Sequence, residues 1–135
     1  MVKIYIAGPL YDEKNRDFLE QIDKICKEFE FETFLPHRDA GLYNGDKTKI
    51  KDISERDLEE IKNCEIMIGV LNGIYIGAGT AWEMGYAQAI GKKVIGLKTD
   101  RKVEESIGDI SVIIAGKVHI VESIEQLKIE LEKLK

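Results

Sequence analysis

The sequence is poor in cysteine and histidine and has no long apolar run. Its two cysteines, Cys26 and Cys64, form no CxxC pair, so we expect ordinary thiols in a reducing compartment. Two histidines cannot supply a zinc-type ligand set, and we expect neither a metal nor a cofactor. The sequence shows no signal peptide and no run long enough to span a bilayer, which predicts a cytoplasmic protein with no membrane partner.

Positive charge is also scarce. The chain has 20 Lys and Arg against 25 Asp and Glu, a formal net charge of −5. This balance disfavours binding to a nucleic acid polymer or to an anionic membrane surface. A small anionic ligand is not excluded, because it needs only a few local donors. The length of 135 residues fits one domain over residues 1–135 with a core of its own.

Apolar periodicity predicts strands that alternate with helices. The predicted strands are Val2–Ala7, Phe31–Leu35, Glu65–Leu71, Lys93–Leu97 and Lys117–Val121. Helical spacing covers Asp12–Phe29, Ile50–Asn63, Ala78–Ile90 and Ser123–Leu134, whereas residues 37–49 and 99–116 are predicted to be loop or weakly patterned. Such alternation predicts an α/β fold with a doubly wound, five-stranded parallel sheet of order 2-1-3-4-5.

In such a sheet, ligands bind at the carboxyl ends of the strands, where the strand order reverses. Here that rule selects Gly8–Tyr11 and Asn72–Glu83 as neighbours across strands 1 and 3. The free N–H groups of the Gly8–Tyr11 turn can hold an anion, although a tight turn without a ligand has the same pattern. A ligand site at this edge is therefore predicted.

Glu83 is the residue to explain in the predicted central helix, which is otherwise almost wholly apolar. One interpretation is structural, because Thr80 to Glu83 matches a capping box in which the glutamate bonds the cap residue's N–H. The other is chemical, because the helix N-terminus favours an ionised carboxylate while apolar neighbours disfavour it. Trp82 beside it is predicted to belong to the core.

Two further residues share this predicted edge. Asp57 lies on the inward stripe of its helix with Ile50, Ile53 and Ile61, although a lone aspartate is often only a solvated surface residue. Two carboxylates in one crevice suit a nucleophile and a proton donor. Tyr5 lies in a strand predicted to be buried on both faces, so its phenol needs a hydrogen-bond partner, which a carboxylate across the edge can supply.

Two weaker patterns also have simpler interpretations. Gly77-Ala78-Gly79 resembles the start of a dinucleotide fingerprint, with Asp100 about 20 residues on. Trp82 stands where that motif has its third glycine, and there is no room for a second substrate domain, so a nicotinamide enzyme is disfavoured. His37 and Arg38 are either exposed loop residues or close over an anion or base.

Three blocks of sequence resemble the nucleoside 2-deoxyribosyltransferase superfamily: Tyr5–Pro9, Asp57-Leu58, and Gly79–Ala87 followed by Gly91-Lys92. The resemblance spans about residues 2 to 116. It implies a flavodoxin-like fold and a homodimer in which each active site is completed by the neighbouring chain.

The resemblance also implies a role for each matched residue. Glu83 falls on the family's nucleophile, which attacks C1′ and expels the base. Asp57 falls on the carboxylate that helps to protonate the leaving base, and Tyr5 on the tyrosine that positions the nucleophile. Ser111 falls where the neighbouring chain reaches into the site. The implied substrate-binding residues are Ile6, Ala7, Gly8, Pro9, Leu10, Tyr11, His37, Gly77, Gly79, Ser111, Val112 and Ile113.

Positions 77 and 111 separate branches of this superfamily. Transferases of free nucleosides carry Asp and Asn there, 2′-deoxynucleoside 5′-phosphate N-hydrolases carry Ser at both, and this chain has Gly77 and Ser111. An aspartate would repel a 5′-phosphate. Leu10 and Tyr11 stand where the hydrolases have a phosphate-contacting arginine.

The resulting prediction is an N-glycosidase, without metal or cofactor, that hydrolyses 2′-deoxynucleoside 5′-monophosphates to free base and deoxyribose 5-phosphate. The alternatives are a transferase that exchanges bases between deoxynucleosides and a non-catalytic nucleotide-binding module. The intact set of Tyr5, Asp57 and Glu83 disfavours the last.

Overall fold

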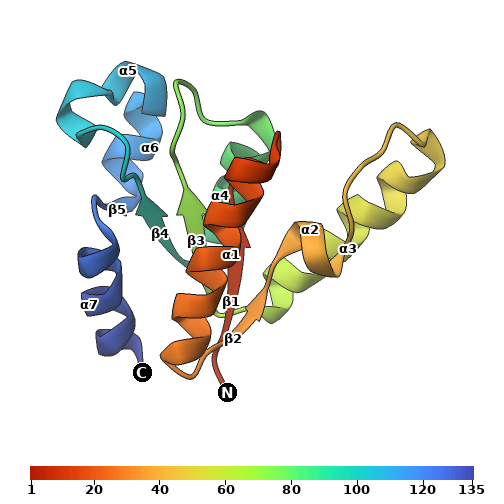
Figure 1. Cartoon of the computed structure of the whole chain (residues 1–135), viewed down its shortest axis with the longest axis horizontal. Coiled ribbons are helices and arrows are strands. Elements are labelled where there is room, and N and C mark those ends of the chain that lie inside the picture. Colours follow the sequence, from red (N-terminus) through yellow and green to blue (C-terminus); the bar gives the residue numbers. More distant parts are fainter.

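Five parallel strands form the centre of the molecule (Figure 1). The computed structural model describes all residues, 1–135. The sheet order is β2-β1-β3-β4-β5, which confirms the predicted doubly wound α/β fold. The strands are β1 (Lys3–Ala7), β2 (Glu32–Phe34), β3 (Ile66–Val70), β4 (Lys93–Leu97) and β5 (His119–Val121).

Helices connect the strands, and local capping explains where several of them begin. Asp12 caps the first helix by accepting the N–H of Asn15, and Ser123 caps the last by accepting that of Gln126. The α-helices are α1 (Glu13–Glu28), α2 (Pro36–Asp39), α3 (Ile50–Asn63), α4 (Ala78–Ala89), α5 (Ile107–Ile110), α6 (Val112–Lys117) and α7 (Ile124–Leu134). Two 3₁₀ turns complete the set, η1 (Lys47–Lys49) and η2 (Val103–Glu105).

The two segments without a clear period contain short helices, which the sequence pattern did not predict. Pro36 opens α2, because its fixed φ suits the first helical position. Asp39 stabilises the same turn by accepting the N–H of Leu35. Helices of one turn are too short to show apolar periodicity, so pattern analysis misses them.

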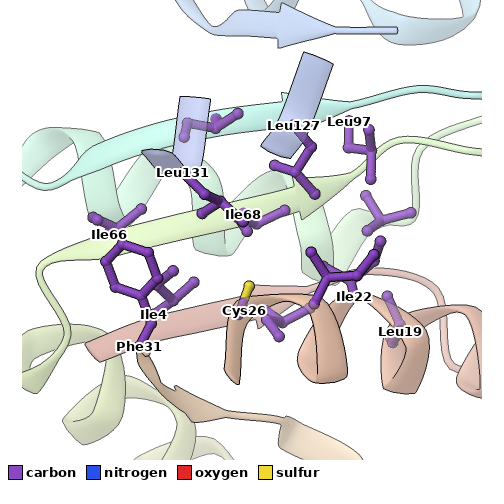
Figure 2. Packing of buried hydrophobic residues seen from close by; sticks show 14 of the residues in the cluster. Ile4, Leu19, Ile22, Cys26, Phe31, Ile66, Ile68, Leu97, Leu127 and Leu131 are labelled. Carbon is purple, nitrogen blue, oxygen red and sulfur yellow. The ribbon is translucent and has the colours of Figure 1, made fainter. Parts of the chain in front are cut away.

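Each face of the sheet is covered by its own helices. On one face, α1 and α7 pack against β1, β3 and β4 and enclose a cluster that includes Ile4, Ile22, Ile68 and Leu127 (Figure 2). On the other face, α3 and α4 contribute Ile61, Met84 and Ala87 to a second cluster, with Tyr5 and Met67 from the strands. Alternate side chains of β1 and β3 therefore point to opposite faces and are buried on both.

The N-terminal half of α3 extends away from the sheet, together with the segment that precedes it (Figure 1). Ile50 is consequently exposed, so the prediction that it continues the inward stripe is wrong. The stripe becomes buried only near the C-terminal end of the helix, at Ile61. No helix of the chain combines the length and the apolar character needed to cross a membrane.

Candidate active site

A cleft of about 500 Å³ opens at the carboxyl ends of β1 and β3, within the range of small-molecule sites. The loop after β1 and the start of α4 both line it, so the two segments selected by the strand-order rule are neighbours. α3 forms a third wall. The lining residues are Gly8, Pro9, Leu10, Tyr11, Ser54, Asp57, Leu58, Ile61, Gly77, Gly79, Thr80, Trp82 and Glu83.

The Tyr5 phenol and the Glu83 carboxylate meet beneath this cleft. Tyr5 is fully buried in β1, and its ring stacks on Phe34 of β2 with ring centroids 5.3 Å apart. Its hydroxyl donates a hydrogen bond to Oε2 of Glu83, which lies in the second turn of α4. The buried phenol needs a hydrogen-bond partner, and the Glu83 carboxylate supplies it, as predicted from the sequence.

Glu83 does not act as a helix cap. α4 begins at Ala78 with Gly77 as its N-cap residue, so Thr80 already lies within the helix, and the capping-box interpretation is wrong. Burial raises the pKa of Glu83 to about 7, although the hydrogen bond from Tyr5 lowers it and the negative charge of Asp57 raises it further. A carboxylate that changes charge near neutral pH is suited to chemistry.

Asp57 faces the same cleft from α3. Burial raises its pKa to about 6, against a smaller lowering by the cation of Arg56. Its Oδ1 atom is buried and has no hydrogen-bond partner. A buried oxygen without a partner is costly, so an incoming ligand with a donor would be stabilised there. The cleft therefore holds two carboxylates that both take up protons more readily than usual.

Gly77 and Tyr11 approach each other at the edge of the cleft. A Cβ atom added at Gly77 would lie 2.6 Å from the hydroxyl oxygen of Tyr11, too close for both to stay in place. Gly77 has φ −62° and ψ 145°, a conformation open to any residue, so the glycine is needed for space rather than for its backbone. The phenol of Tyr11 occupies the place where a side chain at position 77 would stand.

Pattern reasoning missed five lining residues, Ser54, Leu58, Ile61, Thr80 and Trp82. The first three lie on the same helical stripe as Asp57. The stripe indicates that they share one face of the helix, but it does not indicate that this face borders a cleft. Trp82 was predicted to belong to the core, and this is wrong. Its side chain is exposed and stacks on Tyr86, because an indole at this point of α4 faces the cleft and solvent.

Several predicted site residues lie away from the cleft of their own chain. Ile6 and Ala7 are buried in β1 and do not line it. His37 lies on α2, with its Nε2 atom 3.6 Å from the Glu20 carboxylate of α1. Ser111, Val112 and Ile113 lie at the start of α6, all exposed, and Ser111 and Ile113 border a separate groove against α4. No group of three or more His, Cys, Asp or Glu side chains is placed to hold a metal ion.

A family model for nucleoside 2-deoxyribosyltransferases matches residues 4–129. The chain therefore belongs to the nucleoside 2-deoxyribosyltransferase family, a class of enzymes that act on N-glycosidic bonds. Among curated proteins, none matches the chain.

Solved structures share the fold over almost the whole chain. A conserved protein from Enterococcus faecalis V583 has a TM-score of 0.83 at 23% identity, with 100% of this chain and 99% of that chain covered. A 2-deoxyribosyltransferase from Bacillus psychrosaccharolyticus has a TM-score of 0.79 at 24% identity, with 94% and 90% covered. The CMP N-glycosidase BcmB from Clostridium botulinum has a TM-score of 0.63 at 21% identity, with 98% and 97% covered. These likenesses support the fold.

Proposed function

We propose that this enzyme is an N-glycosidase that hydrolyses 2′-deoxynucleoside 5′-monophosphates to free base and deoxyribose 5-phosphate. The observation that carries the proposal is the Tyr5–Glu83 hydrogen bond beneath a cleft that also holds Asp57. A positioned nucleophile and a separate proton donor are what displacement of a base at a sugar carbon requires.

In the proposed first step, ionised Glu83 attacks C1′ of the sugar and the bond between C1′ and the base nitrogen breaks. The electron pair of that bond leaves with the base, which takes a proton from Asp57. Because burial raises the pKa of Asp57 to about 6, part of the population keeps a proton to give near neutral pH. Tyr5 holds the attacking carboxylate in place through its hydrogen bond.

In the second step, water attacks C1′ of the glycosyl-Glu83 ester. Asp57, left ionised by the first step, accepts a proton from that water, and the C1′–O bond to Glu83 breaks. The products are deoxyribose 5-phosphate and the regenerated carboxylate. The cycle consumes only water, so no cofactor takes part in it.

Preference for a 5′-phosphate is supported by the absence of a carboxylate at position 77. Gly77 places no negative side chain at the start of α4, where an aspartate would repel a phosphate. The turn after β1, Gly8 to Tyr11, also lines the cleft, and we expect backbone N–H groups of its non-proline residues to donate to the phosphate.

A homodimer that completes the site forms part of the same proposal. Val112 and Ile113 of α6 are 75% and 70% exposed, and Tyr75 and Trp82 are exposed as well. Several large apolar side chains that are exposed together are more typical of an interface than of a free surface. Ser111, beside them, would then contact the phosphate bound by a second copy.

The product assay is incubation with each deoxynucleoside monophosphate, and with the matching nucleosides, followed by measurement of free base. Release from monophosphates, abolished in Glu83→Gln, is the expected result. Release that persists in Glu83→Gln would overturn the mechanism. Asp52→Asn, an exposed carboxylate on α3, is the matched control and should behave as wild type.

The second candidate is base exchange, the activity for which the matching family is named. Adding a second free base to the assay separates the two activities, because a transferase forms a new nucleoside whereas a hydrolase forms only the sugar phosphate.

A further inference from the structure

The loop that joins β3 to α4 brings Gly77 to the cleft without backbone support of its own. No backbone–backbone hydrogen bond involves residues 72–76. Ile74 and Tyr75, near its tip, are exposed, and Ile76, beside Gly77, is the side chain of this loop that packs against the core. A segment with few internal bonds and exposed side chains is expected to open easily unless something outside holds it.

Lys98, the residue that follows β4, supplies a cation to this loop from beneath. Its side chain is only 1% exposed. The ammonium donates to the carbonyl of Leu71 at 3.0 Å and to that of Gly73 at 3.3 Å, and it pairs with the Asp100 carboxylate at 2.9 Å. Since a buried ammonium is costly without partners, these three contacts account for its place in the fold.

The neighbours of Lys98 bond the same loop. Asp100 accepts the N–H of Gly73 at 2.8 Å, and Arg101 donates to the Gly73 carbonyl at 3.2 Å. Asn72 and Thr99 exchange two hydrogen bonds, each under 3 Å. Residues 98–101, which we call the clamp, therefore hold the loop through side-chain hydrogen bonds.

We propose that Lys98 and Asp100 are positioning residues of the cleft, which hold the β3–α4 loop so that Gly77 and the start of α4 stand where the substrate's phosphate binds. That the substrate carries a phosphate which binds there rests on the proposed function. Neither residue lines the cleft, so both act through the loop and not on the substrate.

The clamp is expected to act on binding and not on the chemical step. Glu83 is held by Tyr5 and by the packing of α4 through Met84, and Asp57 lies on α3. None of these contacts involves a residue of the clamp. Loosening the loop should therefore raise KM and leave kcat in place, because binding energy is lost equally from the ground state and the transition state.

The test uses Lys98→Met, which removes the ammonium and keeps the length of the stem, and Asp100→Asn. The Asp100 side chain is 36% exposed, so we expect Asp100→Asn to fold even if Lys98→Met does not. Lys93→Met is the matched control, since Lys93 is exposed at the opposite end of the same strand and bonds nothing through its side chain. We expect KM for the monophosphate to rise about tenfold in both variants, with kcat within about twofold and the control unchanged.

A second measurement does not depend on turnover. Amide hydrogen exchange over residues 72–77 should be faster in both variants and unchanged in Lys93→Met. If wild type releases no base, the proposed function fails. The clamp is then tested by amide hydrogen exchange and by the Kd of a deoxynucleoside monophosphate, measured by calorimetry. Faster exchange with a raised KM or Kd supports the clamp as a positioning device. Unchanged exchange, an unchanged KM or Kd, or a loss confined to kcat overturns it.

Discussion

The hydroxyl of Tyr5 on β1 donates a hydrogen bond to the carboxylate of Glu83 on α4, two residues that are 78 positions apart in the chain. The bond stabilises the ionised form of a carboxylate whose burial favours the protonated form. In the proposed mechanism Glu83 must be ionised to attack, so Tyr5 would set the fraction of enzyme that is ready to react. Its stacking on Phe34 holds the phenol in one orientation.

Tyr5→Phe should change the pH profile of hydrolysis. The active form needs ionised Glu83, with a pKa of about 7, and protonated Asp57, with a pKa of about 6, so kcat/KM should be bell-shaped with its maximum between these values. Losing the phenol raises the pKa of Glu83, because the hydrogen bond lowered it. The optimum and the falling limb should move to higher pH.

The peak of kcat/KM in Tyr5→Phe should fall about tenfold, as expected for the loss of a hydrogen bond to a charged group. Initial rates from pH 5 to 9 provide the measurement. Tyr43→Phe, a change of the same kind at an exposed residue between α2 and α3, is the control. An unmoved optimum in Tyr5→Phe would show that the phenol does not tune Glu83.

Glu83→Gln should stabilise the fold at high pH and not at low pH. Burial raises the pKa of Glu83 from 4.5 to about 7, so ionisation costs the folded chain more than the unfolded chain. Below pH 4.5 the carboxyl is protonated in both states and the penalty is absent. The penalty grows as pH rises and is complete above pH 7.

The free energy of unfolding of Glu83→Gln should exceed that of wild type by about 3 kcal/mol at pH 8, with the difference vanishing near pH 4. Urea unfolding at both pH values measures it, and Glu59→Gln on the exposed face of α3 is the control. The same difference at both pH values would exclude the electrostatic explanation.

Much of this fold and part of its site could be predicted from the sequence. Long periodic segments determine the sheet order, and the order itself brings Gly77 beside the loop after β1. The predicted start of this helix at Ala78 is confirmed, but whether Glu83 caps it could not be decided from the sequence. Thr80 to Glu83 matches a capping box by residue type alone, and only tertiary packing decides whether the glutamate turns back to the helix end or toward the cleft.

The clamp and the cleft mouth escape pattern analysis for a different reason. A lysine at the end of a strand is expected to be solvated, yet the segment after β3 covers Lys98. The carbonyl groups of Leu71 and Gly73 in that segment accept hydrogen bonds from its ammonium. Trp82 is predicted to belong to the core, yet its side chain is exposed and stacks on Tyr86. The burial of Lys98 depends on the path of a loop, and a loop without backbone hydrogen bonds leaves no period in the sequence.

Gly77→Asp should reverse the preference for a phosphate. The new side chain displaces the hydroxyl of Tyr11 and adds a negative charge at the start of α4. We expect kcat/KM for the monophosphate to fall about 100-fold, and that for the nucleoside to fall far less. Assays of matched nucleotide and nucleoside pairs measure the ratio.

Gly77→Ala is the control for this substitution, because it displaces Tyr11 without adding charge. If Gly77→Ala lowers the ratio as much as Gly77→Asp, space and not charge governs the preference.

Asp57→Asn should slow base departure most for the most basic leaving groups. Without a proton donor, a base of high basicity leaves slowly, whereas an electron-poor base needs little help. kcat/KM, which reports base departure and not the later hydrolysis of the ester, should fall about 100-fold for the natural base and much less for an electron-poor analogue. An equal loss for both bases would assign Asp57 to substrate binding. Asp52→Asn, on the same helix, is again the control.

Complementation between two inactive variants tests whether neighbouring copies share a site. Glu83→Gln removes the nucleophile, and Ser111→Trp blocks the cross-subunit contact that we propose. In a mixed dimer, one site receives both defects, whereas the other combines intact Glu83 of one copy with intact Ser111 of its partner. Mixing the two inactive proteins should therefore restore up to about one quarter of wild-type activity, because half of the dimers are mixed and each has one intact site. Activity that does not return, with mixed dimers present by native mass spectrometry, would place Ser111 outside the shared site and leave α6 as a surface of another kind.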